Sequence, residues 1–320
     1  IMPTAVLIAN PSASQFTGGG FRTIKTTLER SYDLDTQWPV SARESRTATR
    51  EAARRGVDAV FAMGGDGVAH HVANALVGTS TALGLIPVGT TNVLARILGI
   101  PLKAPRAAEA AIAYRALPTR MIRIDATTDL GHMTRHATFS VGFGFDADVV
   151  EAAEARPFAK SRFGGLYYAT TAATRLISSW RTVHPNMRMT CGDDHFDALV
   201  ALTQVHNPYT YFGRWPLHLT PNPPEGVATL AANDLGLPRS SEIFARAAIG
   251  LNHREATGIK LWTDYDSVSI HAEPATPFQA DGELLGLARE ATLTPVEGAI
   301  LILRPDTNPS VGTAQVTTGA

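Results

Sequence analysis

The chain has 320 residues, of which 44% are hydrophobic and 18% are charged, and its formal net charge is −1. This composition is typical of a globular enzyme, the length predicts two domains, and the near-zero charge argues against a nucleic-acid-binding protein. Cys191 is the only cysteine, which excludes an internal disulfide and a cysteine metal cluster and favours a reducing cytoplasm. No apolar run approaches the ~18 residues of a spanning helix, and the start lacks the basic region of a signal peptide.

The first third of the chain alternates between strand and helix patterns. Strands are predicted near 4–9, 33–38, 57–63 and 82–88, and helices near 21–31, 43–56, 67–78, 90–98 and 109–115. Such alternation predicts a parallel sheet with helices on both faces. We therefore expect residues 1–120 to form an α/β domain, and we expect the tail 305–320 to fray or to return to it.

After about residue 120, short strand patterns separated by proline and glycine replace the alternation. They lie near 119–126, 135–142, 186–191, 196–205, 215–220, 226–232, 258–263, 266–272, 291–295 and 299–303. This spacing predicts an antiparallel β-sandwich domain over residues 121–304. A helical pattern at about 147–181 is expected as an insertion into that domain.

The run Met63-Gly64-Gly65-Asp66-Gly67 joins a buried strand to the start of a helix. Free backbone N–H groups and the helix dipole at such a turn attract a phosphate, and glycine lets the phosphate approach the backbone. The carboxylate of Asp66 would be repelled by phosphates unless it holds a metal ion or accepts a proton. The run therefore favours phosphoryl transfer over simple anion binding.

Two further loops follow neighbouring predicted strands. Gly89-Thr90-Thr91-Asn92 opens a helix, with Thr90 or Thr91 as the expected N-cap, and Asn10-Pro11 follows the first strand. Each loop alone is weak evidence, because most glycine-rich turns are only turns. Since the carboxyl ends of parallel strands share one edge of a sheet, the three loops together predict one ligand site.

Residues 278–286 contain a second acidic site, Asp281-Gly282-Glu283. If this stretch is extended, Asp281 and Glu283 point to one side and can act as base and orienter or bind a metal. The alternative is an Asp-Gly hairpin turn, which is the commoner meaning of that pair. The run Gly142-Phe143-Gly144 imitates a dinucleotide fingerprint, but it lies in mid-chain and lacks the acid that should follow, so we interpret it as a turn after a strand.

The set of motifs resembles the diacylglycerol kinase catalytic superfamily, which includes bacterial lipid kinases and sphingosine kinases. The matching residues are Asn10-Pro11, Gly64-Gly65-Asp66-Gly67, Pro87-Val88-Gly89-Thr90-Thr91-Asn92, Gly142-Phe143-Gly144-Phe145-Asp146 and Asp281-Gly282-Glu283. They span nearly the whole chain in the order and spacing of the family. The resemblance implies an α/β nucleotide domain plus a β-sandwich, and ATP- and Mg²⁺-dependent phosphorylation of a lipid hydroxyl.

The resemblance also implies roles for individual residues. The nucleotide would be held by Asn10, Pro11, Gly64, Gly65, Asp66, Gly67, Gly89, Thr90 and Asn92, with Asn92 binding it or ordering its loop. Asp281 would be the general base, with Glu283 beside it. Asp66 is the rival for that role, or it positions the catalytic Mg²⁺. Such chemistry needs positioning, charge neutralisation and one proton acceptor.

Three departures from the family pattern leave other functions open. Val68 stands where a threonine is usual, and His70-His71 replace an Asn-Glu pair and read as a surface or cleft-edge pair. The stretch Pro224 to Thr229 lacks an acid that some members use for a structural Mg²⁺. The alternatives are an NAD-kinase-like soluble nucleotide kinase, which shares the glycine loop, and a degenerate lipid or nucleotide binder without turnover.

The stretch from Arg156 to His184 carries five cationic side chains, no acid, and apolar residues at helical spacing. It favours contact with an anionic membrane or packing of its apolar stripe on the sandwich. We therefore expect a cytoplasmic protein, peripheral at the inner membrane surface, that acts on a lipid and binds no nucleic acid. A homodimer is compatible with the sequence.

Overall fold

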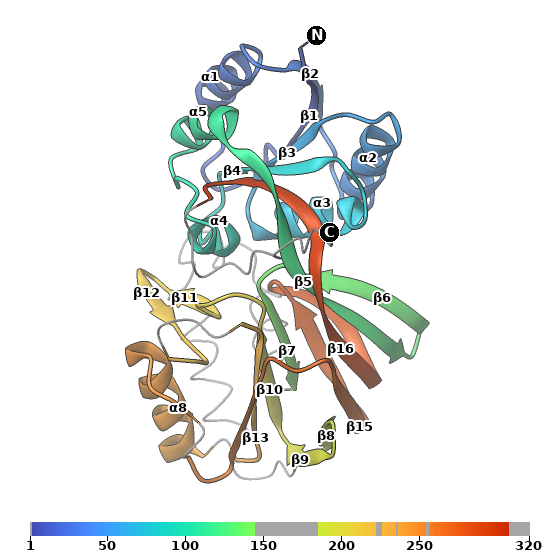
Figure 1. Ribbon diagram of the computed structural model, residues 1–320, viewed down its shortest axis with the longest axis vertical. Coiled ribbons are helices and arrows are strands. Elements are labelled where there is room, and N and C mark those ends of the chain that lie inside the picture. Colours follow the sequence, from blue (N-terminus) through green and yellow to red (C-terminus); the bar gives the residue numbers. More distant parts are fainter. Residues whose placement is uncertain (1, 145–184, 222–225, 235, 254–255, 307–320) are drawn as a thin grey trace, which may run out of the picture. The chain divides into compact units, whose positions relative to one another are not determined.

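A computed structural model describes residues 2–144, 185–221, 226–234, 236–253 and 256–306 (Figure 1). The chain divides into two compact units: unit 1 comprises residues 1–121 and 296–320, and unit 2 comprises residues 122–295. The predicted insertion 147–181, the arginine-rich stretch 156–184, Asp146 and the acid at position 225 lie outside the described residues.

Unit 1 is built on a parallel sheet with the strand order β2-β1-β3-β4-β16. Its strands are β1 (Thr4–Ala9), β2 (Asp33–Gln37), β3 (Ala59–Gly64), β4 (Ala82–Pro87) and the last part of β16 (Glu283–Arg304). β3 and β4 are buried along their whole length and β1 along nearly all of it, which is why they read as continuous apolar runs. The predicted parallel sheet is confirmed.

Five helices cover the two faces of this sheet (Figure 1). They are α1 (Gly18–Leu28), α2 (Ala42–Arg54), α3 (Asp66–Leu76), α4 (Val93–Ile97) and α5 (Ala104–Ala113). α1 packs against α5 on one face, and α2 packs against α3 on the other. Side-chain oxygens of Thr17 and Ser41 cap the first two helices. α5 begins five residues earlier than predicted, because Pro105 suits the first turn of a helix.

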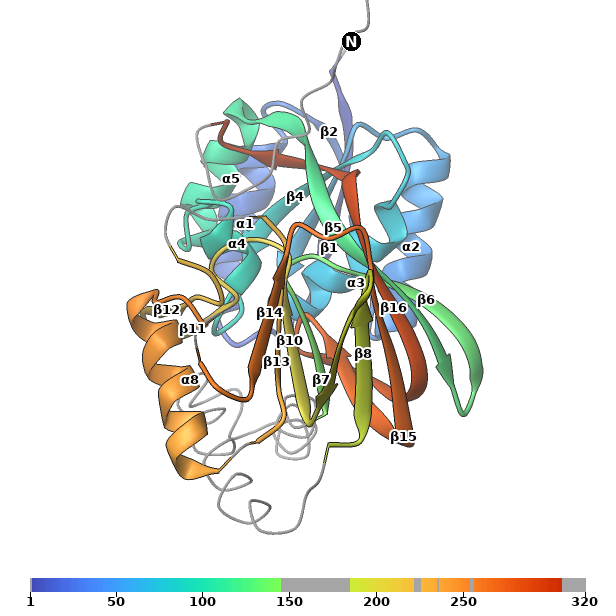
Figure 2. The same cartoon turned by 60° about the horizontal axis from the view of Figure 1, so that its bottom comes forward.

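Unit 2 is an antiparallel assembly, as predicted. Its main strand order is β14-β13-β10-β7-β15-β16 (Figure 2). The strands are β5 (Arg115–Thr128), β6 (Gly131–Ala137), β7 (Ser140–Gly144), β8 (Met187–Cys191), β9 (Asp194–Ala198), β10 (Val200–Gln204), β11 (Thr210–Phe212), β12 (Trp215–Leu217), β13 (Ala228–Ala232), β14 (Ile259–Thr263), β15 (Val268–Ala280) and β16. β6 pairs with β5, β8 pairs with β15 and β9, and β11 and β12 form a separate hairpin. The helix α8 (Leu237–Ile249) accompanies that hairpin.

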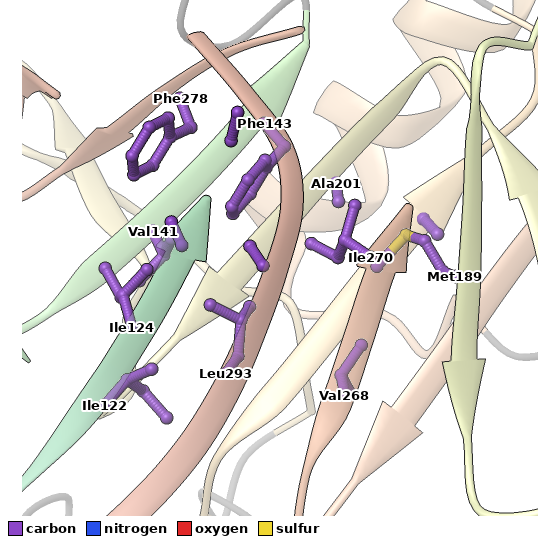
Figure 3. Close-up of a cluster of buried hydrophobic side chains, with 14 of the residues drawn as sticks. Ile122, Ile124, Val141, Phe143, Met189, Ala201, Val268, Ile270, Phe278 and Leu293 are labelled. Carbon is purple, nitrogen blue, oxygen red and sulfur yellow. The ribbon is translucent and has the colours of Figure 1, made fainter. Parts of the chain in front are cut away.

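The core of unit 2 is formed by aliphatic and aromatic side chains from most of these strands (Figure 3). Within it, the rings of Phe143 and Phe278 stack with centroids 5.3 Å apart. A Cβ on Gly144 would lie 2.2 Å from the carbonyl oxygen of Leu199, and the φ of Gly144 is +72°. The interpretation of the Gly-Phe-Gly run as a turn after a strand is wrong, because the run lies within strand β7, where glycine permits close strand packing.

The structure differs from the sequence predictions in four further places. The strand expected at 135–142 is broken at Thr138-Phe139 into β6 and β7, and the two last predicted strands are one strand, β16. Residues from Val296 onward belong to unit 1 and not to the second domain, because Ile302 pairs with Leu83 of β4. The helix α8 (Leu237–Ile249) was not predicted at all.

Candidate functional site

Hydrogen bonds tie the β1–α1 loop to the loops that follow β3 and β4. The N–H of Asn10 donates to the carbonyl oxygen of Met63 at 3.0 Å, and the hydroxyls of Ser14 and Thr90 lie 3.0 Å apart. Gln15 donates from its backbone to Val88 and from its side chain to the carbonyl oxygen of Gly89, both at 2.9 Å. The structure therefore brings the three predicted loops together at the carboxyl edge of the unit 1 sheet.

Gly65 and Gly89 touch where two of these loops meet. A Cβ on Gly89 would lie 2.5 Å from the Cα of Gly65, and a Cβ on Gly65 would lie 3.3 Å from the Cα of Gly89. Side chains are therefore excluded from the junction, and the partly exposed backbone at Gly65 can be approached closely by a ligand. This close packing between the loops is a second reason for glycine, in addition to the approach of a phosphate.

Asp66 is the first residue of α3 and connects two helix starts. Its carboxylate accepts the N–H of Val93 at 3.0 Å and that of Leu94 at 3.2 Å. These are the first two N–H groups of α4, so Asp66 supplies the cap that α4 lacks from its own N-cap residue. The side chain is only partly buried. Through these two hydrogen bonds, the carboxylate that was predicted at the phosphate site also fixes the geometry of the second loop.

Asn92 orders the second loop and is the N-cap residue of α4, in place of the predicted Thr90 or Thr91. It adopts a left-handed conformation with φ 50° and is 5% exposed. Its Oδ1 accepts the N–H of Gly89 at 3.1 Å, and its Nδ2 donates to the carbonyl oxygen of Gly89 at 2.8 Å. Both ends of the amide are thus used to close the turn.

A pocket of about 480 Å³ opens beside the three loops within unit 1. Its lining includes Gln15, Val88 and the first turns of α1 and α5, and it carries the exposed cations Lys103 and Arg106. Two helix starts and two cations favour a negatively charged ligand there. The sequence analysis did not identify Gln15, Lys103 or Arg106 as site residues. Proline is typical of the first turn of a helix, so Pro105 could have placed both cations at the start of α5.

Asp281 belongs to unit 2 and lies in the turn between β15 and β16. Its φ is 55° and that of Gly282 is 80°, as in a two-residue hairpin turn of type I′. The idea that Asp281 and Glu283 share one side of an extended strand is therefore wrong, because the left-handed turn separates them. Glu283 begins β16 and is half-buried.

The carboxylate of Asp281 is 2% exposed and holds the break between β6 and β7. The N–H groups of Thr138, Phe139 and Ser140 donate to it at 2.8–3.1 Å, and the Thr138 hydroxyl donates at 2.9 Å. In return, the N–H of Asp281 donates to the carbonyl oxygen of Ser140 at 2.9 Å. Asp281 thus has a structural role beside any chemical one.

The residues that depart from the family pattern also have defined places. Val68 lies under Gly64, where a Cβ on the glycine would come within 2.5 Å of the Cβ of Val68. His70 is 2% exposed, so its prediction as a surface residue is wrong, while His71 is half-buried and its Nδ1 lies 3.3 Å from Arg46 Nη1. Among the described residues, no group of three or more His, Cys, Asp or Glu is placed to hold a metal.

Comparison with known proteins gives consistent matches. A family model, the diacylglycerol kinase catalytic domain, matches residues 4–124. The probable lipid kinase YegS of Salmonella heidelberg (strain SL476) is 34% identical over 157 residues, which is 47% of this chain and about half, 48%, of that relative. The diacylglycerol kinase of Mycobacterium tuberculosis (strain ATCC 25618 / H37Rv) is 27% identical over 82% of each chain.

Solved structures show the same fold. The crystal structure of a diacylglycerol kinase from Bacillus anthracis str. Sterne matches with a TM-score of 0.69 at 16% identity, over 95% of this chain and 97% of that one. Yeast NADH kinase complexed with NADH matches with a TM-score of 0.52 at 10% identity, over 97% of this chain and 85% of that one. At such identities the likeness concerns the fold alone. The resemblance expected from the motifs is confirmed: the model of the diacylglycerol kinase catalytic domain matches residues 4–124 of this chain.

Proposed function

We propose that the chain is an ATP-dependent lipid kinase that transfers the γ-phosphoryl group to a hydroxyl of diacylglycerol or a related lipid. The observation that carries the proposal is the joining of three loops at one edge of the unit 1 sheet, with Gly65 in contact with Gly89. The family match over residues 4–124 and the lipid kinase relatives support the same class of reaction.

The glycine loops are the proposed cradle for the ATP phosphates. A cradle of this kind suits phosphate because a Cβ would fill the space, as it would at Gly89. The proposed nucleotide-binding residues are those expected from the sequence: Asn10, Pro11, Gly64, Gly65, Asp66, Gly67, Gly89, Thr90 and Asn92. For Asn10 and Asn92 the proposed contribution is to hold the loops in shape, since their amide groups bind loop backbone.

Asp66 is the proposed residue for Mg²⁺, since a single protein carboxylate suits an ion that is held mainly by nucleotide phosphates and water. Bound there, Mg²⁺ would neutralise charge on the phosphates. Asp281 is the proposed proton acceptor, with Glu283 near it in sequence and Asp66 as the rival. In the step itself, the lipid hydroxyl oxygen forms a bond to the γ-phosphorus, the bond from that phosphorus to the bridging oxygen breaks, ADP leaves, and the hydroxyl proton passes to the carboxylate.

The experiment uses the full chain with γ-labelled ATP, Mg²⁺ and a total lipid extract, followed by identification of the labelled product. Label in a phosphorylated lipid supports the proposal, and a parallel reaction with purified diacylglycerol tests the substrate class. A Gly89→Ala chain that still folds is the matched control for background phosphorylation. Label that stays in ATP with every lipid would contradict the proposal.

Two alternatives have their own observations. The fold likeness to yeast NADH kinase supports a soluble nucleotide kinase, and the same assay with NAD⁺ in place of lipid tests it. Val68 and the His70-His71 pair support a degenerate binder, which predicts nucleotide binding by calorimetry without turnover of any acceptor. The three functions therefore give three different product patterns.

A further inference from the structure

The β11–β12 hairpin and α8 expose a set of large apolar side chains on unit 2. Trp215 is 67% exposed, Phe244 48%, Ile249 68% and Leu251 48%. They are four of the six large exposed hydrophobic side chains that the described part of unit 2 contains. Single exposed apolar side chains are ordinary, whereas a gathered set marks an interaction surface.

The apolar side chains of the hairpin, of α8 and of the residue pair after α8 are called here the apolar patch: Phe212, Trp215, Phe244, Ile249 and Leu251. Phe212 pairs directly opposite Trp215 in the hairpin, which puts both side chains on one face. The rings of Phe212 and Phe244 meet edge-on with centroids 5.9 Å apart. The N–H of His218 donates to the carbonyl oxygen of Ala247 at 2.8 Å, and Figures 1 and 2 both show the hairpin beside α8.

The outward side of α8 is apolar over a broad arc. At ~100° per residue, an arc of about 140° holds Phe244, Ala248, Ser241, Ala245 and Ile249 without a charged side chain. The buried Ala247 lies outside this arc, on the side that meets the hairpin. A surface helix normally turns its polar side to water, and α8 does the reverse.

Cations border the apolar patch. Arg214 is exposed next to Trp215, and Arg239 and Arg246 lie together, half-buried, on the side of α8 beyond the Ile249 edge of the apolar arc. Glu242 is the one acid in β11–β12 and α8, and it already pairs with both helix arginines, at 2.5 and 3.0 Å. Three arginines against one glutamate leave a net positive border, which complements anionic lipid headgroups.

We propose that the apolar patch docks the protein on an anionic phospholipid bilayer, with Trp215 at the level of the headgroups. The proposal rests on the proposed function, because the acceptor of a lipid kinase lies in a bilayer. Every helix among the described residues is too short or too polar to span one. A second copy of the chain is a poorer occupant, since a symmetric contact would bring like-charged arginines together. Tryptophan beside arginine is typical of a membrane interface.

The test is co-sedimentation of the full chain with vesicles of phosphatidylglycerol and phosphatidylcholine in equal parts. The variant Trp215→Gln/Phe244→Gln/Ile249→Gln removes three apolar side chains and keeps all charges, so vesicle affinity should fall by roughly tenfold or more. Leu130→Gln is the matched control, because Leu130 is fully exposed, at 101%, on the β5–β6 turn of the same unit. Unchanged vesicle affinity of the triple variant, or an equal loss in the control, would overturn the proposal.

Two further arms complete the design. Quenching of tryptophan fluorescence by brominated lipid should be largely lost in Trp215→Phe, a conservative change that tests the contact even where the triple variant does not fold. In another outcome, the triple variant keeps its vesicle affinity while a dimer of the native chain dissociates in it. That pair of results would assign the patch to a second copy and overturn the proposal. Because binding is measured without turnover, an inactive protein that still binds through the patch contradicts the proposed function and leaves the docking surface supported.

Discussion

The carboxylate of Asp281 holds the backbone of Thr138, accepting its N–H at 2.8 Å and its hydroxyl at 2.9 Å. The same carboxylate that sequence resemblance marks as a proton acceptor is therefore a cap for the break between β6 and β7. The capping hydrogen bonds use the same carboxylate oxygens that a proton acceptor would use. A substitution of Asp281 therefore affects folding as well as any chemistry. The experiments on this residue must measure the two effects separately.

The Asp281→Asn change should lower the free energy of unfolding by about 1–3 kcal/mol, because an amide cannot accept the same set of N–H bonds. If Asp281 is also the base, turnover per folded molecule should fall by ~10²–10⁴-fold. Denaturant unfolding gives the first value and an active-fraction assay the second. Thr138→Val is the control, since it removes one hydrogen bond and no base. Near-normal turnover in folded Asp281→Asn would move the role to Asp66.

The Gly89→Ala change tests the junction of the glycine loops. Its Cβ would lie 2.5 Å from the Cα of Gly65, so one loop must shift. We expect ATP affinity by calorimetry to fall by about tenfold or more, which corresponds to about 1.4 kcal/mol. Gly18→Ala is the matched control, because no atom lies within 4 Å of its added Cβ. If ATP affinity stays unchanged in a folded Gly89→Ala chain, the junction is not part of the nucleotide site.

The Asp66→Asn change separates capping from metal binding. Loss of the charged cap at the start of α4 should cost about 0.5–2 kcal/mol of stability. If Asp66 also positions Mg²⁺, the Mg²⁺ concentration for half-maximal ATP binding should rise. Asp58→Asn, which removes the charge from the group that accepts the N–H of Thr4 at the amino end of β3, is the comparison. An unaltered Mg²⁺ dependence would leave Asp66 with the structural role alone.

Stability should fall on acidification because of buried histidines in unit 2. Burial lowers the pKa of His253, which is 0% exposed, and also that of His218. A group with a lowered pKa in the folded state binds fewer protons there than in the unfolded chain, so stability rises with pH. The contribution is complete above the unfolded value of ~6.5 and is lost as the pH falls toward the folded value. Melting curves across this range should show the loss, and His253→Leu should reduce it, whereas exposed His132→Gln should not.

Much of unit 1 follows from local sequence. Buried parallel strands read as continuous apolar runs, and the glycine loops end them at fixed points, so the sheet and the site edge are both predicted. The five motifs that carry the family resemblance could be recognised for the same reason, since each is a short stretch with its own backbone requirement. Local signals also allowed the Asp-Gly turn, but they could not exclude an extended strand at the same residues.

Other features depend on distant contacts. Asp281 meets Thr138 across more than a hundred residues, and Gly65 meets Gly89 only when two strands lie side by side. α8 packs on a hairpin that lies twenty residues earlier in the chain. The sequence by itself thus determined the strands, the glycine turns and the family, because these depend on neighbouring residues. Only the tertiary structure decided the structural role of Asp281, the junction of the loops and the apolar patch, because each arises from contacts between segments that sequence patterns cannot pair.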